Sequence, residues 1–329
     1  MPTPTDWSSK LQAFVADWKG KWEDQNFQEE RYWGDEPFAA FLVTDHAASW
    51  NDFLDWLSEL RGTWGFRGQR KASWLLHTSL DRAVLRKYSK THGSIVTTGH
   101  YHLNREIEGR DLLFRFQQQA HQYLRHLPAR DDLSSWFALM QHHGVPTRLL
   151  DWTLSPYVGM YFAIEDAPEE NKNNCFALWG IDIEWLEVKA EQLLARKGPS
   201  AMQADPGARA ACVNKLLSQN DEAIIVKVDP LEADDRMSAQ QGFFLCKLKH
   251  PATFNQTLMR MMMDPEAVER PVVRKLEVDA KCRIEFLKIL RRMNIHRASL
   301  FPGLDGFGHM LKLDLEIRAR GEDEPQVRE

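Results

Sequence analysis

The sequence has no apolar run that approaches the ~20 residues needed to cross a lipid bilayer. Its first residues also lack the positively charged start and apolar stretch of a signal peptide. The four cysteines, Cys175, Cys212, Cys246 and Cys282, include no CxxC pair, which is typical of neither a zinc knuckle nor a disulfide framework. We therefore expect a cytoplasmic protein that has no membrane partner and keeps its cysteines reduced.

Motifs that mark the common enzyme scaffolds are also missing. GxGxxG, the Walker loop, HExxH and GxSxG do not occur, which removes support for the usual nucleotide-binding, zincin and hydrolase scaffolds. The formal net charge of −5 does not indicate stable binding to nucleic acid, because an overall grip on phosphates needs a positive balance. A local basic groove is still compatible with this charge.

What the sequence does contain is the composition of a folded protein with both helices and strands. Its 329 residues, 43% apolar and 27% charged, suffice for one large domain or two smaller ones. Apolar residues at helical spacing predict helices over 6–18, 49–60, 103–127, 132–143, 156–167, 183–196 and 206–219. Short runs bounded by glycine, proline or acidic residues predict strands over 63–69, 147–153, 174–182, 222–230 and 242–248.

The remaining segments carry weaker signals. Ser49 is the expected N-cap of one helix, and Ser155 or Thr153 that of another. Residues 34–46 are predicted to break the helical pattern, and residues 281–320 to form a short strand and two helices. The methionine-rich residues 258–264 are expected to pack in the core rather than to bind a cofactor.

One stretch, "QHHGVPTRLLDWTLSPYVGMYFA" at residues 141–163, gathers polar groups at a break between helix and strand. Its adjacent histidines cannot both face one ion from a regular helix, so we predict no metal site. Two interpretations stay open. In one, a histidine caps the helix and Arg148 pairs with Asp151 inside the protein. In the other, a histidine acts in acid–base chemistry, Arg148 binds an anion, and Trp152 or Tyr157 stacks on a ligand.

Two smaller motifs add to this stretch. Arg67 stands before Gly68 at the end of a predicted strand, where a guanidinium is placed to hold a phosphate or carboxylate, or simply to form a salt bridge. "RMSAQQGFF" at residues 236–244 places Arg236, Gln240 and Gly242 just before another strand. Gln240 there either recognises an amide-bearing ligand or satisfies backbone groups.

Taken together, "WGFRGQ", "WLLHTSLDR", the 141–163 stretch, "RMSAQQGFF" and "KILRRMNIHRASLFPGLDG" resemble the FRG domain family, which is named for its Phe-Arg-Gly motif. The resemblance covers roughly residues 45–310. It implies an N-terminal helical extension at 1–45, an FRG domain at 46–318 and a polar tail at 319–329. The family is bacterial and phage-associated, which implies a toxin or antiphage effector.

A more distant resemblance links the chain to ADP-ribosyltransferases of the arginine-serine-glutamate type. "GFRG" is similar to their first strand, and "LLDWTLSPYVGMYFA" to their second strand and helix, whereas Gln240 or Gln241 stands where their glutamate is expected. This resemblance implies an α+β fold, with helices flanking a twisted or split, mainly antiparallel sheet.

The same resemblance implies roles for individual residues toward NAD as substrate. Catalytic roles fall to His142, which would polarise a ribose hydroxyl, to Asp151 as the best placed carboxylate, with Glu222 as a substitute, and to Gln240. Binding roles fall to Arg67, Gly68, Gln141, Arg148, Trp152, Thr153 and Tyr157. Within this set, Arg67 would hold the pyrophosphate or ribose side of NAD, Thr153 would orient the nicotinamide ribose, and Trp152 or Tyr157 would stack on the nicotinamide.

We therefore expect an NAD-dependent ADP-ribosyltransferase or NAD-cleaving enzyme whose partners are NAD or a related nucleotide and an unidentified macromolecular acceptor. A carboxylate is needed because cleavage of the nicotinamide bond passes through a positively charged, oxocarbenium-like state. One alternative is a non-enzymatic domain that recognises a ligand or protein. Another is a nuclease-like activity with His142 as the acid or base, for which the sequence offers no clear partner residue.

Overall fold

The computed structural model describes residues 42–84, 98–166, 175–195, 206–219, 222–229, 235–248, 253–263 and 270–319. Its strands are β1 (Val43–Ala47), β2 (Trp64–Gln69), β3 (Leu149–Thr153), β4 (Cys175–Asp182), β5 (Ile225–Val228), β6 (Gly242–Lys247) and β7 (Val273–Asp279). The helices are α4 (Trp50–Ser58), α6 (Thr98–Gln119), α7 (Leu133–His142), α8 (Pro156–Ile164), α9 (Ile183–Ala195), α10 (Pro206–Gln219), α11 (Asp235–Ala239), α12 (Phe254–Met262), α13 (Arg283–Arg292), α14 (Arg297–Leu300) and α15 (Leu304–Ala319).

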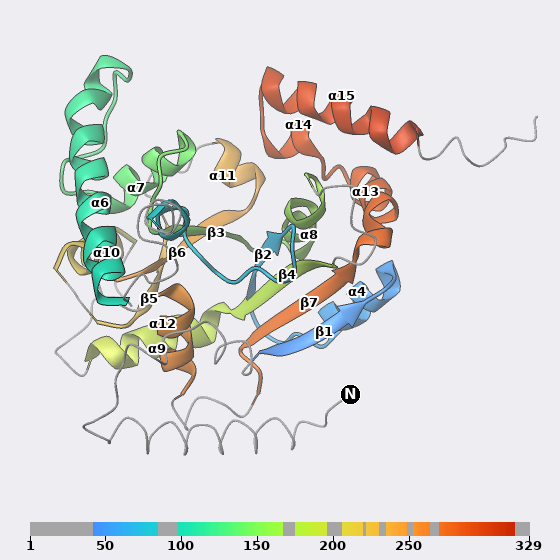
Figure 1. The fold of residues 1–329 in the computed structure, drawn as a ribbon, viewed down its shortest axis with the longest axis horizontal. Helices are drawn as coiled ribbons and strands as arrows, with labels where there is room; N and C mark the ends of the chain where they lie inside the picture. The colour runs from blue at the N-terminus through green and yellow to red at the C-terminus, as the bar shows by residue number, and fades with distance from the viewer. Residues whose placement is uncertain are drawn as a thin grey trace, which may run out of the picture.

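These strands form one seven-stranded sheet in the order β1-β7-β4-β2-β3-β6-β5. Only β1 and β7 run parallel, and the other five pairings are antiparallel. Figure 1 shows the blue β1 lying beside the orange β7, so that segments from both ends of the described chain share one edge of the sheet. The predicted α+β class with a mainly antiparallel sheet is confirmed.

The sheet is almost divided between its two central strands. β2 and β3 are joined through a single residue pair, Phe66 with Thr153, whereas β2 and β4 pair along the whole length of β2. Where two neighbouring strands share so few hydrogen bonds, backbone groups on both strands lack a strand partner. Side chains can then enter the space between the strands. This opening between β2 and β3 is the feature that positions the candidate site.

Local sequence explains where the helices around the opening begin. Ser49 accepts a hydrogen bond from the amide of Asp52 at 3.2 Å and begins α4, as predicted. Ser155 does the same for α8, and Pro156 occupies the first turn, where its missing N–H costs nothing. The α7 helix begins at the N-cap Asp132 and ends before Gly144, whose φ of 76° favours glycine.

Two hydrophobic clusters fill the interior. One packs Trp152, Trp179 and Phe254 with helices α7, α9, α10 and α12, and the other packs Phe66 and Phe286 with α4, α8 and α13. Buried methionines Met259, Met261 and Met262 belong to the first cluster, which confirms core packing for the methionine-rich segment.

The two strands at the β1 edge differ from expectation. Residues 34–46 were predicted to be a break, yet Val43–Ala47 forms β1; and Val273–Asp279 forms β7, whereas the sequence predicted a strand only after residue 280. β1 has a single fully buried residue, Ala47, and β7 carries four charged side chains in seven positions. Neither segment has the apolar run that identifies a strand from the sequence. Each is stabilised as a strand by pairing with its neighbour in the sheet, which the local pattern does not reveal.

Some predicted features lie outside the described residues. They include the helix at 6–18, almost all of the N-terminal extension at 1–45, and the tail at 319–329 apart from its first residue. Among the helices that the structure describes, none combines the length and apolar character that crossing a bilayer requires.

Candidate functional site

A cleft of about 900 Å³ opens where α7, β3 and the α11–β6 turn meet. Its volume falls in the range of small-molecule sites, which is roughly 300–1,000 Å³. Residues on its wall are 124–129, Asp132, Ser135, Ala138, Leu139, Gln141, His142, His143, Asp151, Trp152, Arg236, Met237, Gln240, Gly242, Phe243 and Phe244. The hollow is therefore built by two stretches that are close in the sequence, 124–143 and 151–152, and by a distant one, 236–244.

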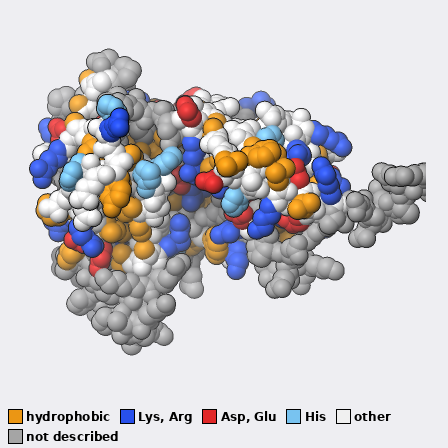
Figure 2. Space-filling model, turned by 90° about the horizontal axis from the view of Figure 1, so that it is seen from above, with side chains coloured by type: hydrophobic (Ala, Val, Ile, Leu, Met, Phe, Trp, Pro, Cys, Tyr) orange, Lys and Arg blue, Asp and Glu red, His pale blue; other side chains and the backbone are white. Residues whose placement is uncertain are grey.

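Histidine and basic side chains stand at this hollow. Figure 2, a view from above, shows a recess near the middle of the molecule with pale blue and blue side chains beside it. The basic side chains on the wall are Arg125 and Arg236, and the acidic ones are Asp132 and Asp151. Because the oxygen Oδ1 of Asp132 already caps α7 and bonds Asn214, Asp151 is the carboxylate that the wall offers to a ligand.

Asp151 is held from two sides yet stays open to solvent. Gln141 donates its Nε2 to the Oδ1 of Asp151 at 2.7 Å, and Arg67 Nη1 lies 3.7 Å from Oδ2. The oxygen Oε1 of Gln141 in turn accepts a hydrogen bond from Thr147. This bond orients the amide so that its NH₂ group, rather than its oxygen, points at the carboxylate. The side chain of Asp151 keeps 64% of its surface exposed, so its position is set without closing it to a ligand.

Arg67 fills the opening between β2 and β3. Its Nη1 donates to the backbone carbonyl oxygen of Asp151 at 2.6 Å, and its Nε is buried without a hydrogen-bond partner among the described residues. Burial lowers the pKa of this guanidinium from its ordinary value, and the charge of Asp151 opposes that effect. The guanidinium is therefore a cation fixed beside the backbone carbonyl of Asp151, and its Nε–H remains as a donor that a ligand could use.

Trp152 supplies a second unused donor. Its side chain is 2% exposed, and its indole N–H is buried with no acceptor within the part of the chain that the structure describes. Because a buried indole N–H usually finds an acceptor, this one marks a place where a ligand oxygen or nitrogen would be favoured. Trp152 contributes to the wall of the cleft together with Phe243 and Phe244.

Arg236 and Gln240 approach the cleft from the opposite wall. The guanidinium of Arg236 lies 4.2 Å from the centre of the Phe301 ring, a cation–π contact that restrains it. Gln240 donates its Nε2 to the carbonyl of Leu300 at 2.9 Å, which ties α11 to α14. The amide of Gln240 thus has a structural partner although the residue also lines the cleft.

The other predicted binding residues lie elsewhere. Gly68 packs against α8, and a Cβ atom there would overlap the backbone of Gly159 and Ala163. Thr153 donates to the carbonyl of Gln240 at 2.6 Å and accepts from the amide of Ser155. These two residues are therefore placed where they hold strands and helices together.

Arg148 and Tyr157 also point away from the cleft. Arg148 donates to the carbonyl of Leu217 at 3.1 Å and lies over the Phe137 ring, so the predicted ion pair with Asp151 does not form. Tyr157 stacks on Trp50 at 6.1 Å between ring centres, within the second hydrophobic cluster. His143, rather than His142, is the C-cap residue of α7.

Sequence reasoning missed one part of the wall. Residues Arg125, His126, Ser135 and Ala138 line the cleft, yet they sit in or beside helices whose pattern indicates only ordinary solvent-facing positions. Nothing in their local sequence distinguishes them from other surface residues, because their role depends on what folds opposite to them.

Comparison with known families identifies one domain. Residues 62–172 match the FRG domain, as the sequence resemblance predicted. This part of the chain carries β2, α7, β3 and α8, and so provides Arg67, Gln141, His142 and Asp151, while Arg236 and Gln240 lie beyond it. Searches of curated proteins and of solved structures gave no match. The chain therefore contains an FRG domain, and its cleft is completed by residues outside the matched range.

Proposed function

We propose that the FRG domain, completed by α11 and β6, binds a nucleotide of the NAD class in the cleft and cleaves its nicotinamide–ribose bond. The observation that carries the proposal is the single cleft that joins Gln141, His142, Asp151, Trp152 and Gln240. A dinucleotide site needs aromatic faces, cationic groups and hydrogen-bond donors, and the lining residues supply each of these.

The binding roles follow from the chemistry of the wall. Arg236 and Arg125 supply positive charge for the pyrophosphate, and guanidinium groups bind phosphate oxygens through paired hydrogen bonds. Phe243, Phe244 and Trp152 supply aromatic surface for the rings. The indole N–H of Trp152 offers a donor to a hydroxyl or amide oxygen of the ligand.

The catalytic role falls to Asp151. In the reaction the bond between ribose C1′ and the nicotinamide nitrogen breaks, and its electron pair returns to that nitrogen and cancels the pyridinium charge. Positive charge then develops on the ribose, where a fixed carboxylate stabilises it. Gln141 and Arg67 hold Asp151 at the wall beforehand, which lowers the reorganisation that the reaction requires.

The nucleophile decides between the two products. Water that attacks C1′ gives ADP-ribose, and its proton passes to Asp151 or to the imidazole of His142. A hydroxyl, amine or guanidinium of a macromolecular acceptor gives the ADP-ribosylated acceptor by the same step. His142 is exposed at the end of α7, so an acceptor can reach it. Either outcome fits a toxin or antiphage effector.

A second candidate is recognition of a nucleotide without turnover. The observation that favours it is Gln240, which is a neutral amide engaged with Leu300 where the resemblance to ADP-ribosyltransferases would place a glutamate. In this case Asp151 would accept hydrogen bonds from ligand hydroxyls, and the polar network of Arg67 and Gln141 would only give shape to the site.

Nicotinamide release from NAD by the full chain tests the proposal. We expect release by the wild-type protein, a loss of about 10²-fold or more in Asp151→Asn, as for other removed electrostatic groups, and no change in Asp55→Asn, which alters an exposed aspartate of α4. NAD binding without release would favour the recognition function. Neither binding nor release would discard both.

A further inference from the structure

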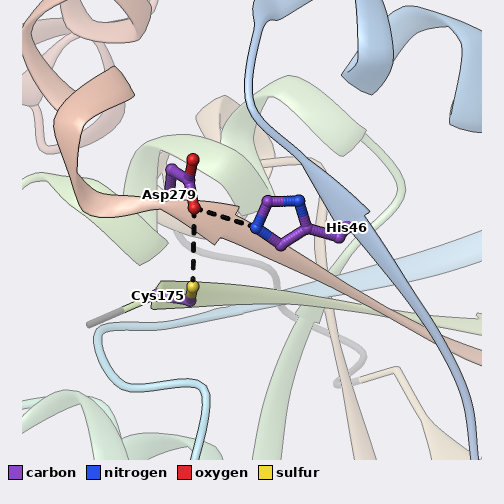
Figure 3. Close-up of side chains that lie close together, drawn as sticks. All are labelled: His46, Cys175 and Asp279. Carbon is purple, nitrogen blue, oxygen red and sulfur yellow. Dashed lines mark hydrogen bonds and ion pairs between the residues drawn. The ribbon is translucent and has the colours of Figure 1, made fainter. Parts of the chain in front are cut away.

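A second group of chemically active side chains lies outside the cleft, at the β1 edge of the sheet. It consists of His46 on β1, Cys175 at the start of β4 and Asp279 at the end of β7 (Figure 3). One donor atom from each residue lies within 4.8 Å of the other two. None of the three contributes to the wall of the cleft, and the proposed function makes no use of them.

Strand register brings the three side chains together. Cys175 is the direct cross-strand partner of Asp279, and His46 is paired with Glu277, two positions earlier on β7. Residues two apart on a strand point to the same face, so His46, Asp279 and Cys175 project from one face of three neighbouring strands. Figure 3 shows the imidazole and the thiol both directed at the carboxylate of Asp279.

The donor atoms are already close to a metal-binding arrangement. His46 Nε2 lies 2.8 Å from Asp279 Oδ1, and Cys175 Sγ lies 3.9 Å from the same oxygen. Donors around one tetrahedral zinc ion are separated by roughly 3.3–3.6 Å, given bond lengths of about 2.0–2.3 Å. The His46 side chain is 55% exposed, so its ring can turn by the small amount needed to admit an ion.

We propose that His46, Cys175 and Asp279 bind one zinc ion, with water in the fourth position. An imidazole nitrogen, a thiolate and a carboxylate are ligands that zinc accepts, and three protein ligands with an open position are typical of reactive zinc sites. Cys175 binds as the thiolate and releases its proton to solvent. Glu277 is held by Lys275 at 2.6 Å, which leaves the fourth position to water.

Lys281 sets the charge balance of this zinc site. Its Nζ lies 2.9 Å from Asp279 Oδ2 and leaves Oδ1 directed toward His46 and Cys175. Its positive charge weakens the binding of a cation nearby by Coulomb repulsion. We therefore expect Lys281→Met to bind zinc more tightly than the wild type. The plain alternative is a surface ion pair between His46 and Asp279, with the thiol as a bystander.

Titration of the full-length apo protein with Zn²⁺ against a chromophoric chelator tests the site. We expect one ion per chain at the cluster and a loss of more than about tenfold in affinity in His46→Gln, Cys175→Ser and Asp279→Asn, since removal of an outer-sphere partner alone costs 10–100-fold. The matched controls are Cys212→Ser, a half-buried free cysteine on α10, and His142→Gln in the cleft. Both should bind as the wild type does.

Replacement of zinc by Co²⁺ gives a second readout that does not depend on affinity. Tetrahedral Co²⁺ bound to a thiolate gives strong visible bands and a sulfur charge-transfer band in the near ultraviolet. We expect both in the wild type and in Cys212→Ser, and loss of the charge-transfer band in Cys175→Ser, with circular dichroism confirming that the variant is folded. No cobalt bands in the wild type, or the same bands in Cys175→Ser, would overturn the proposal.

Discussion

The side chain of Arg67 donates a 2.6 Å hydrogen bond to the backbone carbonyl of Asp151 and joins two strands that otherwise share one residue pair. The guanidinium thus replaces part of the missing ladder between β2 and β3. It also places a cation 3.7 Å from the carboxylate of the same aspartate. One side chain therefore both closes the sheet and positions the group to which we assign the chemistry.

Arg67→Ala should destabilise the fold as well as the site. Loss of a hydrogen bond from a charged donor at a buried position costs about 1–3 kcal/mol, and here it reopens the sheet at its weakest pairing. Urea unfolding measures the change. Arg70→Ala is the matched control, because Arg70 is exposed and makes a 3.4 Å bond to the carbonyl of Asp166 and a cation–π contact 5.8 Å from the centre of the Trp74 ring. It should change the free energy of unfolding by less than about 0.5 kcal/mol. Equal stability of the two variants would refute this role.

Gly68→Ala tests the placement of Gly68 against α8. The added Cβ would overlap the carbonyl oxygen of Gly159 and the amide nitrogen of Ala163, which are backbone atoms that cannot turn aside. We expect a loss of about 2–3 kcal/mol or failure to fold, because overpacking of this kind forces backbone shifts. Thermal unfolding of the purified variant, or its soluble yield, measures this.

Gly308→Ala is the matched control for that experiment. Gly308 lies within α15, and a Cβ atom there meets nothing within 4 Å. In an exposed helix the change should stabilise by about 0.5–1 kcal/mol. A well-folded Gly68→Ala variant would instead show that β2 and α8 are not in such close contact.

Lys247 should make stability depend on pH. Its side chain is 2% exposed, and burial, reinforced by the charge of Arg105, lowers its pKa from 10.5 to about 7. Above pH 7 the folded protein releases this proton while the unfolded chain keeps it up to about pH 10, so the free energy of unfolding rises with pH. The rise should amount to about 1–2 kcal/mol between pH 7 and 9.

Urea unfolding at several pH values checks this expectation. The pH range that tests Lys247 ends near pH 9, the ordinary pKa of a cysteine thiol. Burial raises the pKa of Cys246 to about 11, so above pH 9 this thiol lowers the free energy of unfolding as the pH rises. Lys247→Met should flatten the rise, whereas Lys312→Met on the exposed face of α15 should leave it as in the wild type. A rise that survives in Lys247→Met would assign the pH dependence to another group.

Local sequence predicts the elements around the cleft but not the edge of the sheet. The helix that ends in Gln141 and His142, and the strand that contains Asp151, follow from apolar spacing and from strong stop signals at Gly144 and Pro146. β1 and β7 were missed because charged side chains interrupt their pattern and because they pair with each other across 231 positions of sequence, as Val43 does with Arg274. Such pairing leaves no trace within a short window.

The same limit applies to the sites. Gln141 and Asp151 were recognised together because only a short turn separates them, so one local motif brings both to the cleft. The group of His46, Cys175 and Asp279 has no such motif, since its members come from three strands distant in the chain. Tyr157 shows the converse. It stands six residues after Asp151, yet its place in the first turn of α8 directs its side chain toward the second hydrophobic cluster.

Calorimetric titration of the full chain with NAD tests most directly whether the cleft is a nucleotide site. We predict one saturable site per chain and an affinity at least about tenfold weaker, or ~1.4 kcal/mol, in Arg236→Met, which removes a cation from the wall. Arg115→Met, which removes an exposed cation of α6, should bind as the wild type does. Absence of binding by the wild type, or equal affinity in Arg236→Met, would contradict the account.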